Sequence, residues 1–117
     1  MILFKVIGPQ RCSIFATGRY LKFYYPDTIV TSEPQTHGLM CFWELEHAKD
    51  FILKFGLRGC QIIRVLAVRR TTCIDSACTN TSEFVLDNYY SGVKSKLTRK
   101  SPVPHGTICC RTIRVLE

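Results

Sequence analysis

The sequence predicts a single α+β domain in which a mixed or antiparallel β-sheet is packed by one main helix. Short β-branched or alternating apolar segments, separated by Gly, Pro and polar turns, are typical of strands. Residues 44–55 instead have the three- and four-residue apolar spacing of an amphipathic helix. With 117 residues, 46% of them hydrophobic, the chain can bury one core. Residues 1–117 are therefore one folded domain, and a disordered or coiled-coil chain is excluded.

The first half of the chain holds several short strand candidates. Gly8-Pro9, Thr17-Gly18 and Pro26-Asp27 supply the turns between them, because Gly and Pro favour turn geometry. The predicted strands are residues 2–7, 12–16, 20–25, 28–31 and 39–43. In residues 20–25 every other side chain is apolar. This alternation predicts a half-exposed strand that presents Tyr20, Lys22 and Tyr24 on its polar face.

The main helix has consistent end signals. Acidic residues lie in its first turn, Lys54 lies near its C-terminal end, and Gly56 can end it in a left-handed conformation. Residues 60–68 follow as a β-branched apolar run, which indicates a strand in the interior of the sheet.

The last part of the chain alternates polar and structured segments. Residues 69–80 are a polar connection, after which Asn80 and Glu83 can cap a short second helix over about residues 81–90. Residues 91–105 contain four Lys or Arg, no acid and two prolines, which predicts a long basic loop. Residues 108–116 form the final strand.

Charge is the most informative functional feature. The formal charge is +7, and residues 58–117 hold ten basic and four acidic side chains. A basic surface suits phosphate, so the leading hypothesis is a non-enzymatic binding protein for nucleic acid or another polyanion. Tyr20 and Tyr24 could stack on bases. The expected phosphate contacts are Arg69, Arg70, Lys94, Lys96, Arg99 and Lys100.

Cysteine and histidine residues raise a metal hypothesis. Cys73, Cys78, His105 and Cys109 supply enough ligands for tetrahedral zinc, but their spacing lacks the two short ligand pairs of a zinc finger. Cys109 and Cys110 also point to opposite faces of a strand. Reduced, buried thiols are therefore favoured, and no metal or cofactor is expected.

Two alternatives to polyanion binding remain. A protein-interaction or self-associating module could pair through an exposed strand edge. An enzyme could use an unfamiliar site near His37, although no catalytic motif is present and the sequence leans away from catalysis.

The cellular location follows from what the sequence lacks. Residues 1–7 are too short and too poor in leading positive charge for a signal peptide, and no apolar run reaches the length of a membrane span. Seven cysteines without an export signal favour a reducing, intracellular and cytoplasmic location without a membrane partner.

The order of segments over residues 4–68 resembles small α+β domains common in viruses, phages and some microbes. The resemblance is carried by Phe4-Lys5-Val6, residues 20–25, and Gly38 to Phe42 leading into Ala48 and Phe51. Some proteins of this kind are similar to ADP-ribosyltransferase-like folds, whose transferases carry ordered His, Tyr and Glu or Arg, Ser and Glu sets. Neither set is found here. The resemblance implies a small viral or microbial α+β domain and no catalytic residue.

Overall fold

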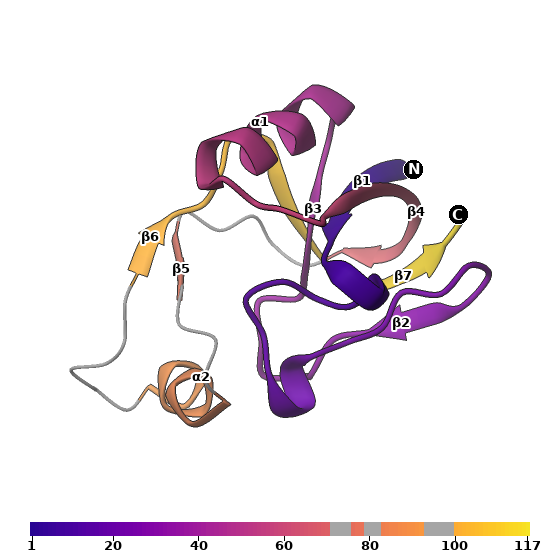
Figure 1. Cartoon of the computed structure of the whole chain (residues 1–117). Helices are drawn as coiled ribbons and strands as arrows, with labels where there is room; N and C mark the ends of the chain where they lie inside the picture. The colour runs from indigo at the N-terminus through magenta and orange to yellow at the C-terminus, as the bar shows by residue number, and fades with distance from the viewer. Residues whose placement is uncertain (71–75, 79–82, 93–99) are drawn as a thin grey trace.

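An antiparallel sheet whose strands close into a ring forms the centre of the structure (Figure 1). The computed structural model describes residues 1–70, 76–78, 83–92 and 100–117. Within these ranges the sheet has the order β2-β7-β3-β1-β4, and an additional pairing of β7 with β4 closes the ring. The strands are β1 (Ile2–Ile7), β2 (Ile29–Thr31), β3 (Leu39–Phe42), β4 (Gln61–Arg70) and β7 (Thr107–Val115).

The inner face of the ring carries the larger hydrophobic core. Successive side chains of a strand point to opposite faces, so Leu3, Lys5 and Ile7 of β1 share the inner face. The apolar residues of this core are Leu3, Ile7, Tyr24, Val30, Leu39, Cys41, Ile63, Val65, Ile108, Cys110, Ile113 and Val115. Lys5 is the charged side chain among them, with 6% of its surface exposed.

Helix α1 (Leu45–Phe55) covers part of the outer face of the ring (Figure 1). Ala48 and Phe51 pack against Val6 and Phe42 in a second buried cluster. Gly56 ends the helix at a φ of 60°, and its N–H donates to the Ile52 and Leu53 carbonyls. The predicted helix and its left-handed glycine cap are confirmed, as is a mostly antiparallel sheet packed by one main helix.

Five predicted strands are confirmed to within two residues at each end, as β1, β2, β3, β4 and β7. Strand β4 pairs with β1 on one side and β7 on the other, so its expected interior position is correct. The β-branched run of this strand buries Ile63 and Val65 inside the ring.

The strands predicted at residues 12–16 and 20–25 are wrong. A short 3-10 turn precedes each segment: η1 (Pro9–Arg11) lies before residue 12, and η2 (Gly18–Tyr20) ends at residue 20. The two segments form one isolated bridge, between Cys12 and Phe23. The reason is the closure of the ring, because β3 and β4 already occupy both edges of β1. The segment that follows β1 in the chain therefore cannot pair with β1 as a neighbouring strand.

The predictions of a polar connection over residues 69–80 and a basic loop over residues 91–105 are also partly wrong. Arg69 and Arg70 belong to β4, and a two-stranded ribbon pairs β5 (Ser76–Cys78) with β6 (Lys100–Pro102). Helix α2 (Glu83–Tyr90) lies beside η2 and away from the ring (Figure 1). The other residues of the two predicted loops between 71 and 99 mostly lie outside the described ranges.

Gly106 offers a test of packing between β7 and α1. Its φ is +82°, and a Cβ built there would overlap the His47 ring, whereas Gly56 has a φ of +60° and open space. Gly56→Ala should cost about 1–2 kcal/mol from left-handed backbone alone. Gly106→Ala should cost about 1–3 kcal/mol more from overpacking. Urea unfolding measures both, and Gly106→Ala combined with His47→Ala should recover the difference. Equal losses in the two single variants would contradict this packing.

Candidate functional site

Lys5 is the most unusual side chain in the described structure. Its ammonium donates a hydrogen bond to the Met40 carbonyl oxygen at 2.8 Å and lies 5.0 Å from the centre of the Tyr24 ring. No carboxylate among the described residues forms an ion pair with it. A buried charge is costly unless it is paired, so this position requires an explanation.

The ammonium of Lys5 stays protonated at neutral pH. Burial lowers the pKa of Lys5, but the surrounding Tyr24, Cys41 and Cys109 outweigh that effect and hold the pKa above its ordinary value of 10.5. The ring face of Tyr24 adds a cation–π attraction. A full positive charge is therefore held in the core.

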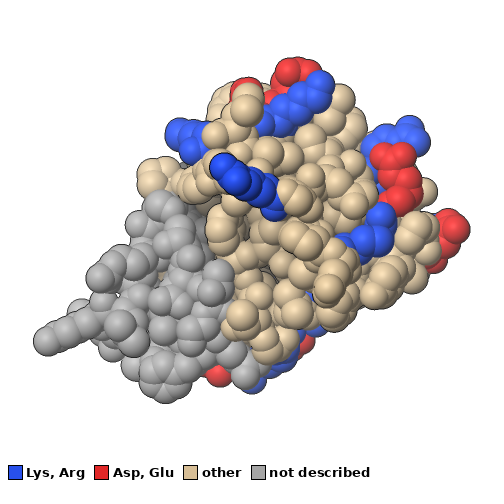
Figure 2. All heavy atoms as spheres, viewed as in Figure 1, with Lys and Arg blue, Asp and Glu red and all other residues tan. Residues whose placement is uncertain are grey.

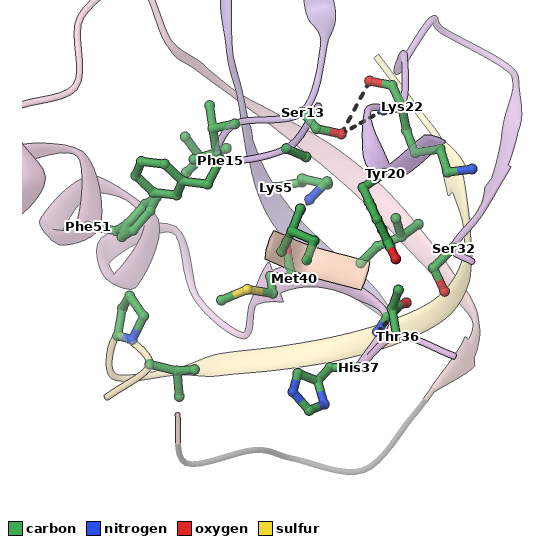
Figure 3. Close-up of a pocket in the computed structure, with 18 of the residues that line it drawn as sticks. Lys5, Ser13, Phe15, Tyr20, Lys22, Ser32, Thr36, His37, Met40 and Phe51 are labelled. Atoms are coloured by element: carbon green, nitrogen blue, oxygen red, sulfur yellow. Dashed lines mark hydrogen bonds between the residues drawn. The ribbon is translucent and has the colours of Figure 1, made fainter. Parts of the chain in front are cut away.

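Lys5 lines a pocket of about 170 Å³. Figure 3 shows Lys5 and Met40 near the middle, with Phe15 and Phe51 toward one end and Tyr20, Ser32, Thr36 and His37 toward the other. The pocket thus has an apolar end, a charged centre and a polar end.

The apolar end is built from phenylalanines. Phe51 lies 5.3 Å from Phe42 and 5.0 Å from Phe55 between ring centres, and its ring is edge-on to Phe15 at 6.3 Å. Phe51 and Phe55 share one face of α1, since residues four apart are neighbours on a helix. This end offers aromatic surface to a ligand.

The polar end is formed by the loop between β2 and β3. Arg111 holds this loop by donating to Ser32 Oγ at 2.9 Å, to the Glu33 carbonyl at 2.7 Å and to the Thr36 carbonyl at 3.1 Å. Lys22 is ion-paired with Glu33 at 2.9 Å. The two cations nearest this end are therefore already engaged within the protein.

Helix α2 contributes to the rim of the pocket. His37 Nε2 and the Tyr89 hydroxyl are 2.9 Å apart, and Asp87 accepts a hydrogen bond from the Tyr20 hydroxyl at 2.5 Å and forms an ion pair with Arg19. Burial and the bond to Asp87 raise the pKa of Tyr20. His37 of the enzyme hypothesis thus lines the pocket, at its polar end.

The predicted polyanion residues are not gathered here. Arg69 is exposed on β4 and does not line the pocket. Arg70 and Lys100 lie on β4 and β6, but their side chains are outside the described part of the structure, as are Lys94, Lys96 and Arg99 entirely. On the face in Figure 2 the Lys and Arg side chains are scattered, several of them beside acids, rather than joined in one patch.

The predicted stacking pair of Tyr20 and Tyr24 is wrong for Tyr24, which is only 1% exposed and belongs to the core. The opposite face of the segment is the exposed one: Phe23 and Tyr25 are 46% and 52% exposed. Their rings are within 4° of parallel, with centres 6.1 Å apart. The segment does not pair with a strand of the ring, and it buries the face that carries Tyr24 and exposes the face that carries Phe23 and Tyr25.

No family model, curated protein or solved structure matches this chain. None of the helices in the described ranges is long and apolar enough to span a membrane. Function must therefore be inferred from the site itself.

Of the four residues of the metal hypothesis, the side chains of His105 and Cys109 lie in the described part of the structure. Cys109 is fully buried and the His105 ring packs on His47, with 4.7 Å between ring centres. Cys73 and the side chain of Cys78 lie outside the described residues. No group of three potential ligands is found among the side chains that are described.

Sequence reasoning missed Lys5. A signal was present, because Lys5 lies in phase with Leu3 and Ile7 on a strand, and the side chains of alternate positions share a face. A lone lysine on the apolar face of a strand is a charge that the fold must bury.

Replacing Lys5 gives a pH-dependent test. A group whose pKa is raised by folding stabilises the folded protein below its unfolded pKa, and this contribution is lost as pH rises through the folded pKa. The difference in unfolding free energy between wild type and Lys5→Met should therefore be constant from about pH 7 to 9. Above pH 10.5 the wild-type protein should lose stability relative to Lys5→Met. Urea unfolding from pH 7 to 12 measures it, with the exposed Lys49→Met as control. A pH-independent difference would count against the buried ammonium.

Proposed function

We propose that this chain is a binding protein whose pocket holds a small anionic ligand against Lys5. The observation that carries the proposal is a buried, protonated ammonium that lines a pocket and has no described carboxylate partner. An anion that displaced solvent there would supply the missing charge, and a buried charge is stabilised by a paired, hydrogen-bonded partner.

Neighbouring hydroxyls support the same reading. Ser13 Oγ and the Tyr24 hydroxyl are 3.3 Å apart, and both residues line the pocket with Lys5. Hydroxyl groups can donate to an anion as well as accept. A mostly apolar pocket with a few convergent polar groups is the usual form of a small-molecule site.

The test is a thermal-shift screen of small carboxylates, phosphates and sulfates. A bound anion should stabilise wild type by about 2.7 kcal/mol at a concentration 100 times its Kd. The shift should vanish in Lys5→Met and persist in Lys49→Met, because Lys49 lies on the exposed face of α1 beside Glu46. If no anion stabilises the wild-type protein, the proposal fails.

Binding of nucleic acid or another polyanion is the second candidate. It is supported by the charge of +7 and by four exposed cations, Lys54, Arg58, Arg69 and Arg114, that form no ion pair with a described carboxylate. The parallel Phe23 and Tyr25 rings offer a stacking surface in place of the predicted one.

Anisotropy with a labelled single-stranded oligonucleotide tests this candidate. Affinity should fall steeply between 50 and about 200 mM salt. Phe23→Ala with Tyr25→Ala should weaken binding about tenfold or more, since stacking contributes about 1–3 kcal/mol per base. Replacing Lys94, Lys96, Arg99 and Lys100 together should flatten the salt dependence, whereas Lys49→Ala should change neither. Absence of binding at low salt would exclude this candidate.

A further inference from the structure

We infer that the ligand of the Lys5 pocket is a monocarboxylate with a single aromatic ring as its apolar body. This inference rests on the proposed function and adds the ligand's charge, its anionic group and its shape. Each of the three follows from a different part of the pocket.

The charge of the ligand follows from the engaged cations. Lys22 is ion-paired with Glu33 and Arg19 with Asp87. Arg111 does not line the pocket and donates to Ser32 and two loop carbonyls. Among the described residues of the pocket, Lys5 is then the positive charge without a carboxylate partner. A monoanion balances it, whereas a phosphate monoester would leave about one negative charge buried and unpaired.

The Cys41 thiol near Lys5 does not supply that negative charge. A hydrogen bond with Cys110 and burial raise the pKa of Cys41 well above its ordinary value, so Cys41 is a neutral thiol at neutral pH. Cys41 and Cys109 are both fully buried. Cys41 therefore supplies no countercharge to Lys5 at neutral pH.

A carboxylate fits the donors around Lys5. One oxygen can accept from the ammonium, and the other from the Ser13 hydroxyl once its proton turns away from the Lys22 carbonyl, to which it donates at 3.3 Å. The Lys22 backbone N–H donates to Ser13 Oγ at 2.9 Å and keeps this oxygen in place. Figure 3 shows Ser13 above Lys5 in the pocket, with both bonds drawn. An ammonium and a hydroxyl suffice for the two oxygens of a carboxylate.

The body of the ligand follows from the apolar end and the volume. Phe15, Phe42, Phe51 and Phe55 line that end, and aromatic rings pack favourably edge to face against one another. The pocket measures about 170 Å³, close to the roughly 150 Å³ of an engineered cavity that binds benzene. A ligand of this kind would have its ring at the phenylalanine end and its carboxylate at Lys5, the two parts joined by a short chain.

Titration calorimetry with three matched probes tests the inference: 3-phenylpropanoate, its neutral amide 3-phenylpropanamide, and phenyl phosphate. Wild type should bind the carboxylate at least about tenfold more tightly than the amide, as one charge-assisted bond implies, and more tightly than phenyl phosphate. Lys5→Met should abolish the preference for carboxylate over amide, and Phe51→Ala should weaken both probes together. Lys49→Met should behave as wild type.

The outcomes separate the two levels of the proposal. Equal wild-type affinity for carboxylate and amide would overturn the carboxylate while leaving pocket binding in place, and tighter binding of phenyl phosphate would overturn the monoanion. Failure of these probes, when other anions produce a shift that depends on Lys5, would overturn the aromatic monocarboxylate alone. Failure of every anion would overturn the proposed function itself. The comparison of probes uses wild type, so it holds even if a variant fails to fold.

Discussion

Backbone pairing by β7 is the constraint on which the rest of the structure depends. Its first residues pair with β3, its later residues with β2, and its opposite edge with β4, so one strand completes the ring. Closure removes the inner face of β1 from solvent and places Lys5 beside Tyr24 and Met40. Closure also leaves β1 without an edge for the segment that follows it, and that segment instead folds over one opening of the ring and supplies Ser13 and Phe15 to the pocket. Topology and candidate site therefore have one origin.

Those parts of the fold that depend on local pattern were predictable. Helix α1, its Gly56 cap and the apolar runs of β4 and β7 follow from periodicity and end signals within a few neighbouring residues. The strand prediction for residues 20–25 was wrong because alternation shows which side chains share a face but not which of the two faces is buried. That choice depends on a partner strand. Residues 20–25 pair with no strand of the ring, and Tyr24 is buried while Phe23 is exposed. Ring closure itself depends on pairings between distant segments, which no local pattern encodes.

The candidate site was less predictable than the fold. Its lining comes from β1, the segment after it, the β2–β3 loop, β3, α1, α2 and residues near Pro104, so no sequence spacing brings these residues together. The net charge predicted a binding surface made of the abundant cations in the second half of the chain. The cation that the structure makes unusual is instead a single lysine in the first strand. Composition counts charges, but the energetic cost of a charge depends on burial, which only the three-dimensional arrangement of the strands determines.

The position of β7 in the chain also has a consequence for synthesis. Thr31 and Thr112 contact each other across β2 and β7 although 81 positions separate them. A ribosome must therefore release the segment 107–115 before the ring can form, and long-range pairing of this kind slows folding. Until then β2, β3 and β4 each present a strand edge without its partner, and open edges pair readily with other chains. A nascent or truncated chain that lacks this one strand should thus depend on chaperones, whereas the finished protein protects the same edges within its own ring.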